Sequence, residues 1–133
     1  MGLFNFLKPK NEQMPITTFS RNLSINEKVA ITSAMFLIVN QHGKRQIHPT
    51  EFKYIQDISK NIIGLDEKDL LATRPEGFDF PTILKAMSEK DRKYFSFVFY
   101  SLANIMQDKQ VIGLASHIIK DIGCSVDDVS KNA

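Results

Sequence analysis

The sequence predicts an all-α fold, a single-domain bundle of helices. Its 133 residues match the usual length of one domain. Two capping patterns, in which a serine is followed three residues later by an acid, begin at Ser24 and Ser88 and mark helix starts. The stretch 88–107 is apolar on almost every side, and a helix of that kind must be surrounded by other helices.

The stretch 88–107 is predicted to be the central helix. Its apolar side chains point in every direction around the helix axis, and only a narrow polar stripe, formed by Ser96, Tyr100 and Asn104, could face a polar neighbour or water. A membrane span needs about 20 apolar residues, whereas this apolar stretch is shorter and is flanked by charges. We therefore expect the other helices to pack around it.

The remaining helices are predicted from caps, terminal proline or glycine, and apolar spacing. The helix that Ser24 caps is heavily buried, and Gly43 follows it as a left-handed residue. The helix that starts at Pro49 and ends at Gly64 has one buried face, which is formed by Phe52, Ile55, Ile58 and Ile62. In chain order, the helices are expected at residues 24–41, 49–63, 67–72, 81–87, 88–107, 111–122 and 125–129.

The chain divides into an N-terminal arm of residues 1–23, a helical domain of residues 24–129 and a frayed tail of residues 130–133. Within the arm, residues 3–10 combine large apolar side chains with two lysines. One interpretation is a short turn that packs onto the core. The other is a short amphipathic anchor that contacts a membrane surface or a partner. The first is favoured because so short an anchor is marginal in water and in lipid.

The composition excludes several classes of function. The net charge of +2 is small and acids alternate with bases, so nothing argues for a nucleic acid partner. A single cysteine, Cys124, rules out an internal disulfide framework, and no secretory signal is visible, so we expect a cytoplasmic protein. The chain has no phosphate loop, nucleophile elbow or HExxH motif, and its three histidines and Cys124 lack zinc-site spacing. We predict no catalytic residues and no enzyme.

The chain also contains an internal repeat. Each half has a very apolar helix, a polar loop and an amphipathic helix that ends in Ile-Gly. An apolar residue, a capping residue and an acid three positions further on then follow, at residues 63–70 in the first half and 122–129 in the second. The bundle is therefore predicted to consist of two pseudo-repeated helical hairpins with short connecting helices, packed through their apolar helices.

This layout resembles the tellurite-resistance TerB-like family, an all-helical domain of two related hairpins that also occurs fused to DnaJ-like co-chaperones. The resemblance covers about residues 24–129. It implies the pattern Asp-Gly-x-Ile-x-x-x-Glu in each hairpin loop, whose acids cluster and bind a divalent cation. In the second hairpin, Asp108 and Val111 match the Asp and Ile of the pattern, and Ala115 stands in place of Glu.

The first hairpin keeps the other half of the pattern. Ile47 and Glu51 match, but Lys44 stands in place of Asp and Arg45 in place of Gly. Glu51 and Asp108 are therefore the candidate metal ligands that the resemblance implies. Two acids near two bases form a poor site for Ca²⁺, which takes about six to eight oxygen ligands. We expect Lys44 to lie near one of the two acids and to neutralise it as an exposed pair, worth about 0–1 kcal/mol.

Each acid also has a structural explanation. Glu51 is the third residue of its helix, where a negative charge complements the helix dipole, and Asp108 is a common type of turn residue. We therefore expect no cofactor, with a divalent cation at Glu51 and Asp108 as the alternative.

The expected function is a non-enzymatic cytoplasmic interaction or scaffold module with a protein partner, and the resemblance adds a link to stress. The first alternative is a protein that binds or senses a divalent metal through its loop acids. The second is a small enzyme.

Overall fold

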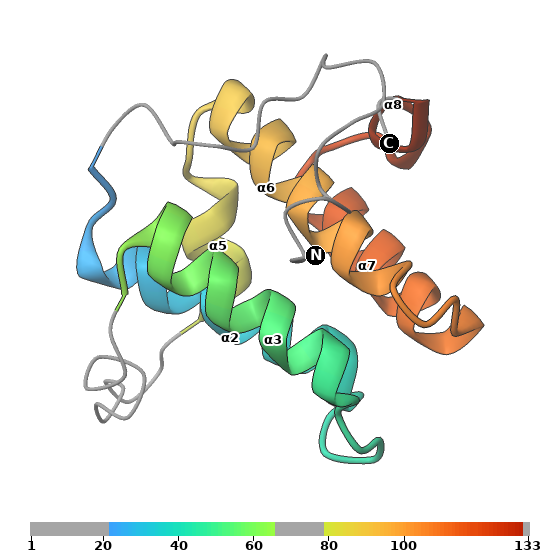
Figure 1. The fold of residues 1–133 in the computed structure, drawn as a ribbon. Coiled ribbons are helices and arrows are strands. Elements are labelled where there is room, and N and C mark those ends of the chain that lie inside the picture. Colours follow the sequence, from blue (N-terminus) through green and yellow to red (C-terminus); the bar gives the residue numbers. More distant parts are fainter. Residues whose placement is uncertain (1–21, 66–78, 132–133) are drawn as a thin grey trace.

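Two long helices, α2 (Ile25–Asn40) and α6 (Glu89–Ala103), pack against each other at the centre of the computed structural model (Figure 1). The structure describes residues 22–65 and 79–131. Within these two ranges the chain is helical and contains no strand, which confirms the predicted all-α class. None of the helices in the described ranges is long and apolar enough to cross a membrane.

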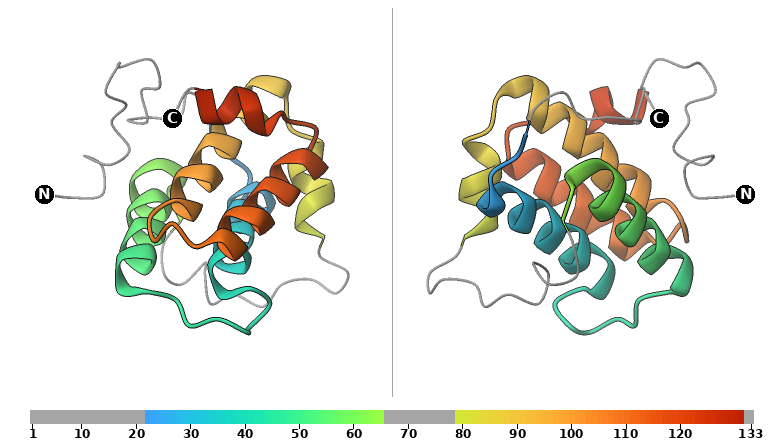
Figure 2. Two further views of the ribbon diagram at one scale, coloured as in Figure 1. Left: turned by 90° about the vertical axis from the view of Figure 1, so that its right-hand side faces the viewer. Right: turned by 60° about the vertical axis from the view of Figure 1, so that its left-hand side comes forward.

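Shorter helices enclose this central pair (Figure 2). α3 (Pro49–Ile58) continues directly into a π-helix, η1 (Ser59–Ile63), and lies against α2. α7 (Lys109–Asp121) packs on both central helices. α5 (Phe80–Lys85) packs on α2, and α8 (Val126–Lys131) packs on α6. The result is one continuous core to which every described helix contributes.

Local hydrogen bonds at the helix starts explain why the sequence signals succeed. At α2, the Ser24 hydroxyl accepts from the Glu27 N–H at 3.1 Å, and a Glu27 carboxylate oxygen accepts from the Ser24 N–H at 2.9 Å. At α6, the Ser88 hydroxyl accepts from the Asp91 N–H at 3.2 Å. α3 begins at Pro49 as predicted, but its N-cap is His48, whose role the sequence analysis did not identify.

The central helix α6 differs from its prediction in two respects. It ends at Ala103, before the predicted end at residue 107, and Met106 in the following loop is 41% exposed. Ser96, which belongs to the stripe predicted to face a polar neighbour or water, is completely buried. The reason is that α2, α3, α7 and α8 all pack on α6, so the Ser96 side of the helix is also covered.

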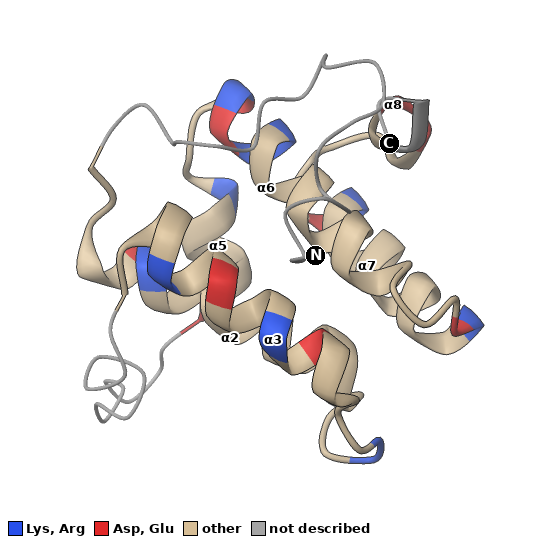
Figure 3. Ribbon diagram, viewed as in Figure 1, with Lys and Arg blue, Asp and Glu red and all other residues tan. Residues whose placement is uncertain are grey.

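The helix that begins at Pro49 buries Ile55, Ile58 and Ile62 as predicted and differs from the prediction at two other positions. Phe52 is 43% exposed, although the apolar spacing placed it on the buried face. Tyr54 is instead fully buried, because its hydroxyl donates to the Val98 carbonyl of α6 at 2.8 Å and so remains hydrogen-bonded inside the core. Along α3 and η1, acidic and basic residues alternate in the chain (Figure 3), and Lys53 pairs with Asp57 at 3.0 Å.

Other predictions fall at the edges of the described ranges. The helix expected at residues 67–72 and the arm residues 1–21 lie outside the described residues. Leu23, at the end of the arm, is buried in the core. At the other end of the domain, α8 extends to Lys131, two residues into the predicted tail.

Replacing Gly123 with alanine is expected to destabilise the protein more than replacing Gly43. Both glycines have left-handed φ angles, +87° at Gly123 and +82° at Gly43, which cost an alanine roughly 1–2 kcal/mol. A Cβ at Gly123 would also lie 2.7 Å from Nη1 of Arg92, whereas nothing lies within 4 Å of one at Gly43. That nitrogen donates to the Ile122 carbonyl at 2.9 Å, so moving it breaks a hydrogen bond.

Urea unfolding of the two variants measures this difference. Gly43→Ala reports the cost of the backbone conformation alone, so the excess loss in Gly123→Ala is assigned to Arg92. Equal losses would mean that the Arg92 side chain moves away at no cost.

Candidate functional site

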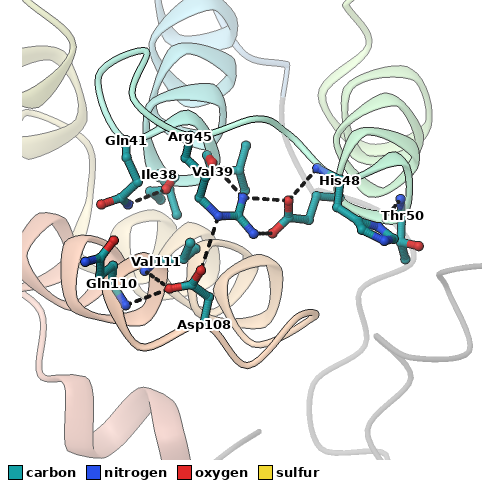
Figure 4. Close-up of polar contacts among 10 residues, drawn as sticks. Ile38, Val39, Gln41, Arg45, His48, Thr50, Asp108, Gln110 and Val111 are labelled. Atoms are coloured by element: carbon teal, nitrogen blue, oxygen red, sulfur yellow. Dashed lines mark hydrogen bonds and ion pairs between the residues drawn. The ribbon is translucent and has the colours of Figure 1, made fainter.

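Arg45, in the loop between α2 and α3, donates four hydrogen bonds through its guanidinium (Figure 4). Its Nη1 and Nη2 donate to the two carboxylate oxygens of Glu51, at 2.8 and 3.1 Å. This two-pronged geometry is the strong arrangement of a guanidinium with a carboxylate. Arg45 therefore holds the loop against the first turn of α3.

The same guanidinium also joins two distant segments of the chain. Nη1 donates to the Val39 carbonyl near the end of α2 at 2.7 Å, and Nε donates to a carboxylate oxygen of Asp108 at 3.3 Å. Asp108 lies in the loop between α6 and α7, so the contact links chain segments 63 residues apart. We refer to Arg45, Glu51 and Asp108 as the Arg45 cluster.

Glu51 is the buried member of the cluster. It is the third residue of α3, and one of its oxygens also accepts from the His48 N–H at 2.9 Å, which completes a capping box. Its side chain is completely buried, and that of Arg45 is 19% exposed. A buried carboxylate is tolerated only with a charged, hydrogen-bonded partner, and Arg45 supplies it.

Asp108 is the exposed member, with a side chain 36% exposed. It is the N-cap of α7, and one oxygen accepts from the N–H groups of Gln110 and Val111, at 2.9 and 3.4 Å. The Gln110 N–H foremost, and then the Val111 N–H and Arg45, lower the pKa of Asp108, because each favours the charged carboxylate. The hydrogen bond to Glu51 correspondingly raises the pKa of Arg45. Asp108 and Arg45 are therefore both charged at neutral pH.

The cluster corrects the expectation for Lys44. Arg45, and not Lys44, bridges the two acids, and the Lys44 side chain is exposed. The pairing is also not a surface contact, because Glu51 is fully buried. The planar guanidinium explains the choice, since it binds a carboxylate through two parallel hydrogen bonds and has donors left for other acceptors. The residue type of Arg45 was thus a usable signal that the sequence analysis did not use.

The structure brings the two predicted metal ligands, Glu51 and Asp108, together on one guanidinium. All four of their carboxylate oxygens accept hydrogen bonds, from Arg45 or from backbone N–H groups. Ala115, which stands where the family pattern has its Glu in the second half, is completely buried in the core. Across the described ranges, no group of three or more His, Cys, Asp or Glu side chains could hold a metal ion.

The arrangement is chemically that of an internal ion cluster. A positive guanidinium already occupies the position between the two carboxylates, where a divalent cation would have to bind. The Arg45 cluster does not place a nucleophile beside a separate base, and covalent catalysis needs at least these two groups. The cluster can fix the relative position of α2, α3 and α7, and that is a structural role.

Comparisons with family models, with curated proteins and with solved structures find no match to this chain.

Proposed function

We propose that this chain is a non-enzymatic, TerB-like interaction module made of two pseudo-repeated hairpins that needs no metal. The observation that carries the proposal is an apolar stripe on the outside of α2 and α3. Ile25, Val29 and Phe36 lie on one face of α2, and Ile25 is 53% exposed while the other two are half-buried. Phe52 of α3 extends the stripe, with its ring centroid 6.2 Å from that of Phe36.

The stripe, defined as Ile25, Val29, Phe36 and Phe52, is unusual for α2. A surface helix normally turns polar residues outward, but this face of α2 carries Ile25, Val29 and Phe36. A scattered exposed apolar residue needs no explanation, whereas several in a row are typical of a binding surface. Two aromatic rings add to this, because aromatic residues are enriched at protein interfaces.

Matching contacts in the two halves support the pseudo-repeat. A basic residue follows the serine N-cap by four positions in both central helices, Lys28 in α2 and Arg92 in α6. Lys28 Nζ donates to the Gly64 carbonyl at 3.2 Å, and Arg92 Nη1 donates to the Ile122 carbonyl at 2.9 Å. In each half, therefore, the cation joins the first helix to the end of the second.

The π-helix is consistent with the same repeat. From N-cap to terminal glycine, the second helix of the first half (48 to 64) is one residue longer than that of the second half (108 to 123). A π-helix accommodates one extra residue without ending a helix. In this alignment, His48 occupies the position that corresponds to Asp108. The family pattern had instead placed Lys44 at that position.

A pull-down from an extract of the source cells, with wild type and Phe52→Ser compared, tests the proposal. We expect Phe52→Ser to lose the partners that wild type retains, since it removes the largest exposed side chain of the stripe. Met106→Ser is the matched control, because Met106 is 41% exposed in the loop after α6 and lies outside the stripe. Equal recovery with all three proteins would contradict binding through the stripe, provided that their melting temperatures agree.

Millimolar Ca²⁺, Mg²⁺ or Zn²⁺ is expected to leave the melting temperature unchanged, because the oxygens of Glu51 and Asp108 are already hydrogen-bonded. Differential scanning fluorimetry measures this. An ion present at 100 times its dissociation constant would stabilise the fold by about 2.7 kcal/mol, so a rise of several degrees would contradict the prediction. Arg45→Ala, which leaves the two carboxylates without their cation, is measured in parallel.

The cytoplasmic location and the link to stress belong to the same proposal. The single cysteine supports a reducing compartment, and the stress link rests on the TerB-like layout alone.

A further inference from the structure

We propose that residues Leu3–Leu7 of this chain dock on the stripe of α2 and α3 and compete with the partner for it. The inference rests on the proposed function and adds its regulation. The segment Leu3-Phe4-Asn5-Phe6-Leu7 lies outside the described residues and carries four large apolar side chains in five positions. The stripe is the complementary surface, because Ile25 and Phe52 are 53% and 43% exposed.

The connection along the chain favours this segment over a separate molecule. Residues 8–21 join it to Asn22, just before Ile25, the first residue of the stripe. Fifteen residues from Leu7 to Asn22 reach up to roughly 50 Å, and the stripe from Ile25 to Phe36 is about 16 Å long. A tether of this kind holds the segment near the stripe at an effective concentration of about 1 mM.

The tether also sets how strong the contact must be. A segment with an intrinsic dissociation constant below about 1 mM would cover the stripe for more than half of the time. A partner that binds the stripe must first displace it, so its apparent affinity is reduced by the fraction of molecules that are open. Weakening the segment would therefore increase binding of the partner.

A single tryptophan reports on the stripe, since the natural chain contains none. Phe52→Trp is compared with Phe52→Trp carrying Phe4→Ser and Phe6→Ser, always in the full chain. If the segment docks on the stripe, the two serines shift the emission to longer wavelength and increase acrylamide quenching severalfold. Met106→Trp, with and without the same serines, is the control and is expected not to change. Unchanged emission in the Phe52→Trp pair, or an equal change in the Met106→Trp pair, would overturn the inference.

The pull-down separates this inference from the proposed function. Phe4→Ser with Phe6→Ser, in the chain that retains Phe52, is expected to recover more partner than wild type. Equal recovery would refute the competition and leave the interaction module intact. If neither wild type nor the chain with Phe4→Ser and Phe6→Ser recovers a partner, but the tryptophan shift is present, the proposed function is refuted and the docking of the segment stands.

Discussion

Replacing Arg45 with alanine is expected to lower the free energy of unfolding by about 3 kcal/mol, the lower end for breaking a buried ion pair. The reason is Glu51, which is completely buried and would keep only the His48 N–H as a partner. The lower end applies because Arg45 is 19% exposed, so water can partly replace the guanidinium. Urea unfolding measures the loss.

Lys44→Ala is the matched control for this prediction. Lys44 is the neighbouring basic residue and is exposed, so its removal should change stability by less than about 0.5 kcal/mol. A second variant, Arg45→Met with Glu51→Leu, removes both charges of the buried pair and should recover part of the lost stability. A loss below about 0.5 kcal/mol in Arg45→Ala would show that the Arg45 cluster does not hold the two hairpins together.

Leu102→Ala is expected to cost about 2–5 kcal/mol, because it opens a cavity in the core. Leu102 is fully buried on α6, the helix that α2, α3, α7 and α8 enclose. Met106→Ala is the control four residues further along the chain, where the side chain is 41% exposed. Its effect should stay within about 0.5 kcal/mol. Similar small losses in the two variants would mean that α6 is not central to the fold.

The existence and the starts of the described helices could be predicted because their signals are local. The caps at Ser24 and Ser88 involve residues three positions apart, so the sequence contains both partners of each hydrogen bond. The left-handed glycines that follow the second helix of each hairpin, Gly64 and Gly123, are local signals of the same kind. The all-helical class follows from these signals.

Which face of a helix is buried depended on its neighbours. Spacing alone placed Phe52 inside and put Ser96 in a stripe that could face water or a polar neighbour, whereas in the structure Phe52 is exposed and Ser96 is completely buried. Apolar residues recur on more than one face of α2 and α6, so periodicity could not select the packed side. Tyr54 occupies the inner position on α3 because the Val98 carbonyl of α6 accepts its hydroxyl, and a sequence gives no such distance.

The sequence by itself determined that this protein is a helical domain, and the family resemblance added Glu51 and Asp108 as candidate ligands. Only the tertiary structure decided that Arg45 joins them, because the contact with Asp108 connects segments 63 residues apart. Lys44 and Arg45 are adjacent and carry the same charge, so charge alone cannot choose between them. Packing of the helices makes the choice, since it leaves Lys44 in water and places the guanidinium between two carboxylates.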